Sequence, residues 1–197
     1  MGKIFYIMGK SSSGKDTIYK SLSGDKALGL KTVVLYTTRP VREGETDGVE
    51  YYFVDEARLQ EFERSGKLIE VRAYHTVHGV WKYFTVNDSQ IQLAENNYLI
   101  IGTLVSFQKM RDYFGTDRVV PIYIEVEDGI RLQRALERER VQKEPKYAEM
   151  CRRFLADSED FSEEKLHGAG IVRRFENREL AECIEEIRTF ISGQIMI

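Results

Sequence analysis

The segment at residues 9–15 constrains this chain more than any other part of its sequence. It consists of Gly9, Lys10, Ser11, Ser12, Ser13, Gly14 and Lys15. An apolar run at 4–8 precedes it and a helix-like stretch at 17–22 follows it, and in this context a G-x-x-x-x-G-K sequence forms a phosphate-binding loop. Backbone N–H groups converge on a phosphate there, and Lys15 reaches the β- and γ-phosphate oxygens. The segment predicts an ATP site with Lys15 as a catalytic residue; the alternative is a plain Gly/Ser turn.

The residue after Lys15 departs from the usual pattern of such loops. Asp16 stands where a Ser or Thr hydroxyl commonly binds Mg²⁺. A carboxylate is a suitable hard ligand for this ion, but it also brings negative charge toward a triphosphate. Thr17 supplies the hydroxyl instead if the helix begins one residue later. We expect ATP and Mg²⁺ as cofactors, with Asp16 and Thr17 as the candidate metal ligands and both in the ATP site.

The pattern of apolar residues predicts the fold class. Five short apolar runs predict buried strands, at 4–8, 32–36, 98–101, 119–126 and 171–175. Helix-like stretches lie between and around them, at 17–22, 57–65, 106–114, 130–140, 147–155 and 180–191. This alternation predicts a three-layer α/β fold with a mostly parallel central sheet covered by helices on both faces.

Two segments interrupt the alternation. Residues 37–84 are rich in Gly, Tyr, Arg and Glu with only short β-like pieces, and residues 131–165 are highly charged. We therefore expect one domain over residues 1–197, of a size that buries a sheet between helices. Its expected parts are a core at 1–36, 87–129 and 166–197, an acceptor-binding lobe at 37–86 and a helical lid at 130–165.

Composition excludes several classes of partner. The 29 Lys and Arg residues are outnumbered by 32 Asp and Glu residues, which argues against a nucleic-acid-binding protein of the usual basic kind. No apolar run approaches the roughly 18 residues that a membrane span needs. The two cysteines lack metal-site or disulfide spacing, which fits a reducing compartment. We expect a cytoplasmic protein, a monomer or homodimer, that binds small molecules.

A second motif predicts a second phosphate site. Arg39 and Arg42 lie three residues apart next to a predicted strand end, and a loop with Glu45 and then Tyr51 follows. A pair of guanidinium groups suits a doubly charged phosphate, since each fork binds two oxygens. The alternative is an exposed Arg/Glu loop.

With this motif the sequence resembles the guanylate kinase family, because residues 37–51 contain its T-T-R-x-x-R-x-G-E-x-x-G-x-x-Y pattern. The resemblance implies that the phosphate of GMP is held in this segment, and that a glutamate in Lys67-Leu68-Ile69-Glu70 accepts hydrogen bonds from guanine. A carboxylate facing two donors favours guanine over adenine. The implied GMP site consists of Arg39, Arg42, Glu45, Tyr51, Glu70, Tyr83 and Thr85. The alternative for Glu70 is a solvated residue at a strand end.

The charged segment resembles the lid of the same family. Arg134, Arg138 and Arg153 match its arginines, and Arg152 is an adjacent candidate. Arginines stabilise the charge on a phosphoryl group in transfer, so the resemblance implies a catalytic set of Lys15, Arg39, Arg134 and Arg153. The alternative is a solvated helical face. Asn177 matches a late asparagine near the adenine, or it is a helix cap.

The chain departs from the family at three positions. Ile101 and Thr103 stand in place of two aspartates, and Leu35 in place of a serine that contacts the base. We expect an ATP-dependent kinase that phosphorylates GMP or dGMP to GDP or dGDP in purine nucleotide metabolism. Two alternatives remain open. One is a kinase of another phosphorylated acceptor such as ribose 1,5-bisphosphate, whose kinase shares the Gly-Lys-Asp loop, and the other is a non-catalytic phosphopeptide-binding module.

Overall fold

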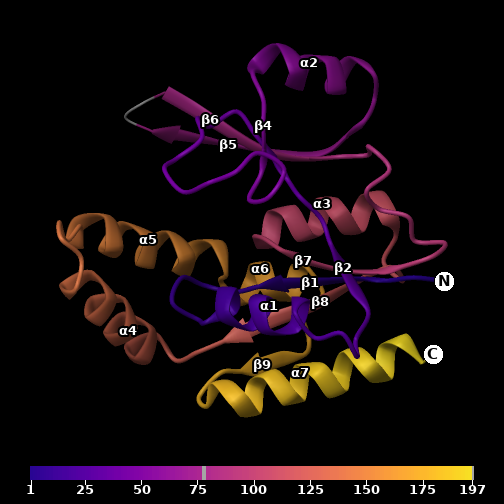
Figure 1. Ribbon diagram of the computed structural model, residues 1–197. Coiled ribbons are helices and arrows are strands. Elements are labelled where there is room, and N and C mark those ends of the chain that lie inside the picture. The colour runs from indigo at the N-terminus through magenta and orange to yellow at the C-terminus, as the bar shows by residue number, and fades with distance from the viewer. Residues whose placement is uncertain (77–78, 197) are drawn as a thin grey trace.

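The computed structural model describes residues 1–76 and 79–196, which form a larger and a smaller sheet with surrounding helices (Figure 1). The larger sheet has the strand order β2-β7-β1-β8-β9. Its strands are β2 (Leu30–Thr32), β7 (Asn97–Ile101), β1 (Ile4–Met8), β8 (Val119–Glu125) and β9 (Arg174–Glu176). Every neighbouring pair is parallel, as the alternation of strands and helices predicted.

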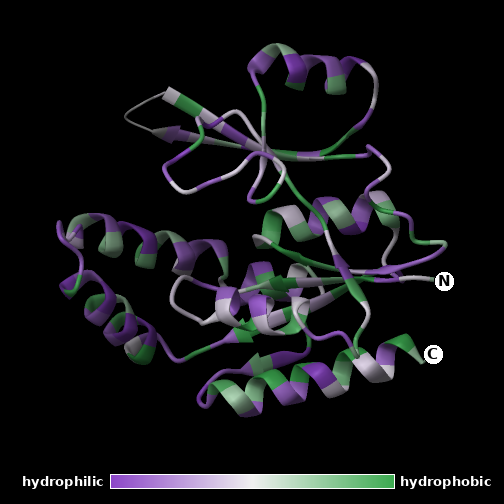
Figure 2. Ribbon diagram, viewed as in Figure 1, coloured by the Kyte–Doolittle hydropathy of each residue, from purple (hydrophilic) through white to green (hydrophobic). Residues whose placement is uncertain are grey.

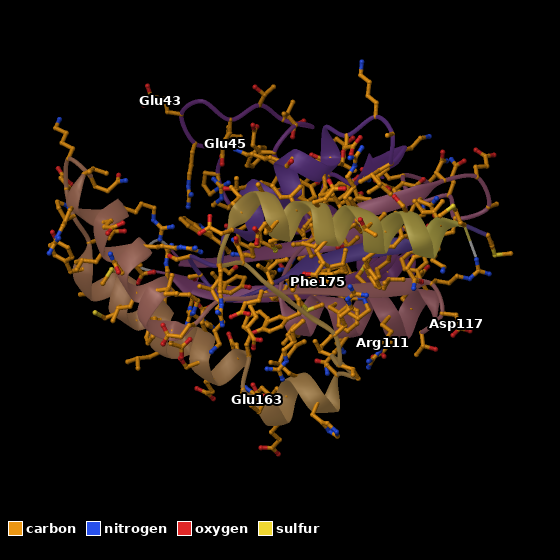
Figure 3. All side chains as sticks on the ribbon, turned by 90° about the horizontal axis from the view of Figure 1, so that it is seen from below. Glu43, Glu45, Arg111, Asp117, Glu163 and Phe175 are labelled. Atoms are coloured by element: carbon orange, nitrogen blue, oxygen red, sulfur yellow. The ribbon has the colours of Figure 1, made fainter. Side chains whose placement is uncertain are left out.

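The central strand β1 shows why the apolar runs are continuous. All five of its residues are buried, because helices cover both faces of the sheet. Phe5 and Ile7 face one helix layer, formed by α1 (Lys15–Ser23) and α7 (Leu180–Ile195). The alternate residues of β1 face the other layer, formed by α3 (Leu104–Phe114) and α6 (Glu163–Gly168). Figure 3 shows Phe175 of β9 next to α7, with which it shares a hydrophobic cluster.

The smaller sheet has the order β4-β3-β6-β5 and carries α2 (Glu56–Arg64) on one side. Its strands are β4 (Tyr52–Phe53), β3 (Tyr36–Thr37), β6 (Gly79–Val86) and β5 (Leu68–Thr76). Leu59 and Phe62 of α2 pack on Phe84 and Val86 of β6. Ile69 of β5 joins the core cluster that contains α3, so the smaller sheet is anchored to the larger unit.

The charged segment forms α4 (Asp128–Arg140) and α5 (Tyr147–Asp160), which lie to one side of the larger sheet (Figure 1). Both helices are mostly hydrophilic, as the purple ribbon of Figure 2 shows, and α5 has no fully buried residue. Such a helix is held by few apolar contacts, so its position depends on polar contacts with the loop next to it.

The predicted fold class is confirmed, and one predicted strand is wrong. Residues 32–36 do not form one strand: β2 ends at Thr32 and β3 begins at Tyr36, in different sheets. Between them the backbone N–H and C=O of Val34 bond to the side chain of Gln90 instead of to a neighbouring strand. Within residues 1–76 and 79–196, every helix is too short or too polar to cross a lipid bilayer.

Candidate functional site

The phosphate loop lies between β1 and α1, as predicted, and its backbone is bent at two residues. Ser12 and Gly14 have positive φ angles of 62° and 84°. A Cβ atom on Gly14 would lie 2.4 Å from the Nδ2 atom of Asn177, so only glycine fits there. That Nδ2 donates a 2.8 Å hydrogen bond to the buried carbonyl of Ser13. Asn177 therefore lies against the loop and holds its backbone, a contact that the sequence did not predict.

Several polar atoms of the loop are available to a phosphate. Gly14 is the N-cap of α1 and offers no side chain to its first-turn amides. The hydroxyl oxygens of Ser12 and Ser13 are buried and have no hydrogen-bond partner among the described residues. Buried polar atoms of this kind are normally satisfied, so these two hydroxyls are candidate donors to a bound phosphate.

The two candidate metal ligands lie on the surface at the start of α1. Asp16 has a side chain 78% exposed, and its Oδ2 atom lies 3.5 Å from the Nζ of Lys15. Thr17 is also exposed. The described residues contain no cluster of three or more His, Cys, Asp or Glu side chains around one point. The loop thus fits Mg²⁺ only in the way this ion commonly binds, with one protein oxygen and the rest from phosphates and water.

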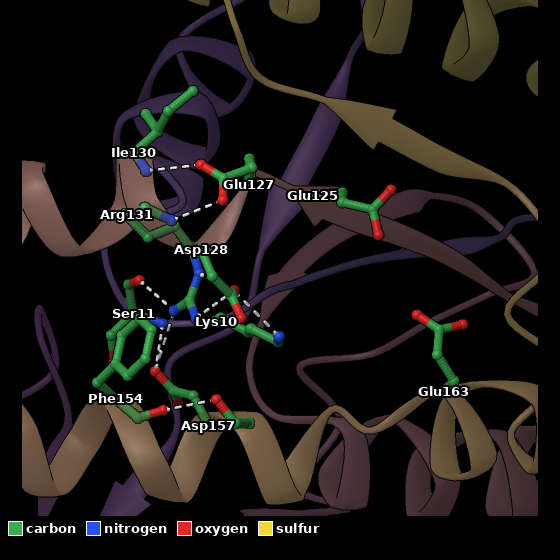
Figure 4. A network of polar contacts seen from close by, with 12 residues as sticks. Lys10, Ser11, Glu125, Glu127, Asp128, Ile130, Arg131, Phe154, Asp157 and Glu163 are labelled. Carbon is green, nitrogen blue, oxygen red and sulfur yellow. Dashed lines mark hydrogen bonds and ion pairs between the residues drawn. The ribbon is translucent and has the colours of Figure 1, made fainter.

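Helices α4 and α5 each bond to the phosphate loop through one residue that the sequence did not single out (Figure 4). The Nη1 of Arg131 on α4 donates to the Ser11 carbonyl at 3.1 Å, and Asp157 on α5 accepts from the Ser11 N–H at 2.6 Å. The buried Arg131 guanidinium also bonds to Asp128 and lies 4.7 Å from the ring centre of Phe154. Lys10 points away from the loop toward Asp128, at 3.3 Å. Nothing in the local sequence distinguishes Arg131 from the other arginines of α4.

The predicted lid arginines occupy different positions. Arg134 donates to the carbonyl of Asn177 at 3.2 Å, next to the phosphate loop. Arg138 lines a cleft together with Ser11 and Ser12. Arg152 and Arg153 both bind Glu149, at 2.7 and 2.8 Å, and lie exposed on α5. The hydrogen bond from Arg152, and to a smaller extent that from Arg153, lowers the pKa of Glu149 to about 2.

Arg39 and Glu45 form the centre of the predicted acceptor site. The Arg39 side chain is only 3% exposed and binds Glu45 through both Nη atoms, at 2.9 and 2.7 Å. This bonding raises the pKa of Arg39 and lowers the pKa of Glu45. The Arg39 guanidinium lies 5.7 Å from the ring centre of Tyr51. The alternative of an exposed loop is wrong for Arg39; Arg42 is exposed and lies 5.8 Å from the Trp81 ring centre.

A buried carboxylate lies on the smaller sheet. Glu70 is 4% exposed, which excludes the solvated alternative, and it accepts a 2.8 Å hydrogen bond from Thr85 on the neighbouring strand. The sequence predicted Glu70 and Thr85 in one site but missed Arg72, which bonds to Glu70 at 3.0 and 3.2 Å. Tyr83 packs edge-on against Tyr51, with ring centres 5.5 Å apart.

Two clefts connect these groups. One, of about 380 Å³, is lined by the phosphate loop, α4 and α5, and includes Arg138. The other, of about 1040 Å³, lies between α5 and the smaller sheet and includes Tyr51, Arg72 and Tyr83. Lys146, Glu149 and Arg153 line both clefts. Figure 1 shows α5 and the β5-β6 hairpin projecting on the same side of the molecule. The side chains of α5 therefore border the phosphate loop in one cleft, and in the other they face Tyr51 and Tyr83 of the predicted acceptor site.

Comparison with known proteins decides the family. The family model for guanylate kinase matches residues 1–192. The chain belongs to the guanylate kinase family. It is 30% identical to the guanylate kinase of Methylobacillus flagellatus, over 98% of this chain and 90% of that protein. It is 29% identical to that of Porphyromonas gingivalis, over 98% and 97%.

A guanylate kinase crystal structure from Anaplasma phagocytophilum has the same fold. It superposes with a TM-score of 0.65 at 20% sequence identity and covers 100% of this chain and 87% of its own. The predicted family, kinase class and α/β fold are therefore confirmed.

At the guanylate kinase positions where this chain departs from the family, the structure places a neutral polar cluster. Thr103 caps α3 through a reciprocal pair of contacts with Ser106. The buried Tyr6 hydroxyl donates to Ser106 at 2.7 Å, and burial raises the pKa of Tyr6 to about 12. A Cβ on Gly102 would lie 2.2 Å from that hydroxyl. This end of β7 therefore offers hydroxyl groups, whereas the family pattern expects carboxylates.

Proposed function

We propose that this protein transfers the γ-phosphoryl group of ATP to the phosphate of GMP or dGMP, with ADP and GDP or dGDP as products. The observation that carries this proposal is the position of α5. Its N-cap Lys146 and its residues Glu149 and Arg153 border both the cleft at the phosphate loop and the cleft that contains Tyr51 and Tyr83 of the acceptor site. Phosphoryl transfer requires mainly that two phosphates be held in line and that their charge be neutralised. Lys146 and Arg153 supply positive charge to both clefts.

The contacts of each residue indicate its proposed role in phosphate binding or in transfer. The loop amides and Lys15 bind the β- and γ-phosphates of ATP, with Asn177 and Arg134 fixing the loop's shape. Arg39, Arg42 and Tyr51 bind the acceptor phosphate, and Glu45 holds the Arg39 fork in place. Arg138 and Arg153 balance the charge that spreads over the phosphoryl oxygens during transfer.

Residues 130–165 act as a lid in this proposal. Closure of α5 toward the smaller sheet brings Arg153 onto the transferred group and excludes water, which limits ATP hydrolysis. Asp16 or Thr17 would hold Mg²⁺, which would supply positive charge to the phosphates of ATP. We propose a cytoplasmic enzyme of purine nucleotide metabolism that acts as a monomer or homodimer and does not bind nucleic acid.

One observation favours a second acceptor. Arg72 bonds to the Glu70 carboxylate, and the uncharged residues Ile101 and Thr103 stand in place of the family's two aspartates. The groups expected to bind guanine are therefore partly engaged or missing. A phosphorylated sugar such as ribose 1,5-bisphosphate needs no such groups. It requires only the phosphate-binding arginines.

The test is ADP formation from Mg-ATP with GMP, dGMP, AMP, UMP, CMP and ribose 1,5-bisphosphate in turn. We expect the guanine nucleotides to give the highest kcat/KM, and Lys15→Met to abolish the signal. If only ribose 1,5-bisphosphate gives ADP, this sugar phosphate and not GMP is the acceptor. No ADP with any acceptor would refute the kinase proposal and favour a phosphopeptide-binding role.

A further inference from the structure

The carboxylate of Glu70 is already held by three hydrogen bonds. Its Oε1 accepts from the Thr85 hydroxyl at 2.8 Å and from Nη2 of Arg72 at 3.2 Å, and its Oε2 accepts from Nε of Arg72 at 3.0 Å. The Glu70 side chain is 1% exposed and that of Arg72 is 14% exposed. These three bonds therefore belong to the interior of the acceptor site.

The lone pairs of Glu70 set a limit on what else it can bind. A carboxylate offers about four acceptor positions, two on each oxygen. Thr85 and Arg72 use both positions on Oε1, and Arg72 uses one on Oε2. Guanine presents two adjacent donors, the N1–H and the N2 amino group, which fit a carboxylate with one bond to each oxygen. Since Oε1 has no position left, a two-bond contact with guanine requires Arg72 or Thr85 to release it.

Arg72 is placed to hold Glu70 by the geometry of β5. Residues two apart on a strand project from the same face, and Arg72 follows Glu70 by two. Burial opposes the charge of Arg72, but Glu70 together with Tyr6 and Tyr74 raises the pKa of Arg72 above its ordinary value. Arg72 therefore stays charged, and a base must compete with a guanidinium for the Glu70 carboxylate.

The cleft that Arg72 lines, between α5 and the smaller sheet, carries excess positive charge. Lys146, Arg152 and Arg153 line it from the lid side, opposite Arg72, while Glu149 is the one acidic residue among its described lining. An acceptor with a second anionic group in place of a base would meet these cations and would leave the Glu70–Arg72 pair intact.

We propose that Arg72 is a specificity-determining residue that competes with guanine for Glu70, weakens GMP binding, and widens the acceptor range toward base-free sugars carrying two phosphates. This rests on the proposed function, because it assigns the cleft beside Glu70 to the acceptor. Thr85 is the smaller competitor, since its hydroxyl contributes one uncharged hydrogen bond.

Calorimetric titration without ATP tests the proposal on Arg72→Lys, which keeps the charge but loses the fork that engages both oxygens. We expect GMP to bind about fivefold more tightly than to the unmodified protein, the effect of about one hydrogen bond. AMP binding stays within about twofold, because adenine lacks the two adjacent donors. Arg64→Lys, on the exposed side of α2, is the matched control and leaves all affinities unchanged.

A second titration measures the binding of ribose 1,5-bisphosphate to Arg72→Met. Loss of the guanidinium weakens this ligand about tenfold, in line with a charge-assisted hydrogen bond. Circular dichroism identifies any variant that fails to fold, in which case Arg72→Lys alone decides the test. Weaker or unchanged GMP binding by Arg72→Lys overturns the proposal, as does the absence of GMP binding by every variant.

The binding assay separates this inference from the proposed function. If the protein forms GDP but Arg72→Lys binds GMP no better, only the role of Arg72 is wrong. If no acceptor yields ADP but GMP still binds Arg72→Lys more tightly, the role of Arg72 stands and the kinase proposal fails.

Discussion

Residues 9–15 offer a phosphate mainly backbone amides, whereas residues 39–51 offer it guanidinium groups and a tyrosine. The loop is fixed by bonds to its own backbone, from Asn177, Arg131 and Asp157. The acceptor arginine is fixed by a carboxylate that binds both of its Nη atoms. A site made of backbone is set by the fold, while a site made of side chains depends on ion pairs that one substitution changes. The backbone shape of the first site therefore depends mainly on its glycines, and the second site is where specificity diverges.

The largest expected effect is at the loop. Lys15→Met removes the cation that the proposed function assigns to the ATP phosphates, and we expect kcat to fall by about a thousandfold, as for loss of a main electrostatic group. The fold should stay intact, because the backbone contacts of the loop do not involve this side chain. Steady-state ADP formation measures the loss, and Lys20→Met, exposed on the same helix, is the control. Equal activity of Lys15→Met and Lys20→Met would show that Lys15 does not act on the phosphates, and would contradict the role assigned to the loop.

The next effect is at the acceptor end. Arg39→Lys replaces a fork that binds two oxygens with a single ammonium, and we expect kcat/KM for GMP to fall about thirtyfold. The affinity for ATP should not change, because the Arg39 guanidinium bonds to Pro40 and Glu45 and lies near the Tyr51 ring, and none of these belongs to the phosphate loop. Titration with ATP alone and with GMP alone distinguishes the two ends. A parallel loss of ATP affinity would show that the sites are not independent.

A pair of glycines compares the rigidity of the two loops. Gly14 and Gly44 have nearly the same positive φ, 84° and 83°, but a Cβ would meet Asn177 at Gly14 and nothing within 4 Å at Gly44. Alanine at either position costs about 1–2 kcal/mol for the left-handed backbone. Gly14→Ala should cost about 1–2 kcal/mol more, because Asn177 loses its place. Urea unfolding measures the loss of unfolding free energy for both variants. Equal losses would mean that the phosphate loop accommodates a Cβ atom as easily as the acceptor loop does.

The smallest effect concerns the lid. Arg152 and Arg153 depress the pKa of Glu149 to about 2, so its folded-state pKa lies below that of an unfolded glutamate. The contribution of this contact is present above pH 5 and is lost only as the pH falls toward 2. NMR titration of the Glu149 carboxyl carbon should show no protonation at pH 4, and high salt should raise its pKa because the pair is exposed. Protonation near pH 4.5 would contradict the ion pair.

The sequence predicted the loop more completely than the acceptor site, for a physical reason. The strand, turn and helix at residues 4–23 form from neighbours in the chain, so pattern and spacing suffice. Arg39 with Glu45 is also local. The contacts of Glu70 with Thr85, and of Ser11 with Asp157, join residues 15 and 146 positions apart and depend on how the units pack.

Two errors have the same origin. A strand over 32–36 fits its apolar residues, yet the chain changes sheets there, and Gln90 bonds the backbone of Val34 from a distant segment. Arg72 was overlooked because an arginine on a polar strand is usually solvated. Its burial follows from pairing with Glu70, which only the folded arrangement reveals.

A crystal structure with a bisubstrate analogue, adenosine joined to guanosine through five phosphates, tests the central claim most directly. The account predicts one phosphate on the amides of residues 9–15 and Lys15, and the guanosine-side phosphate on Arg39, Arg42 and Tyr51, with Arg153 between them. An analogue bound with its guanosine-side phosphate away from Arg39, or with α5 turned away from both clefts, would contradict it.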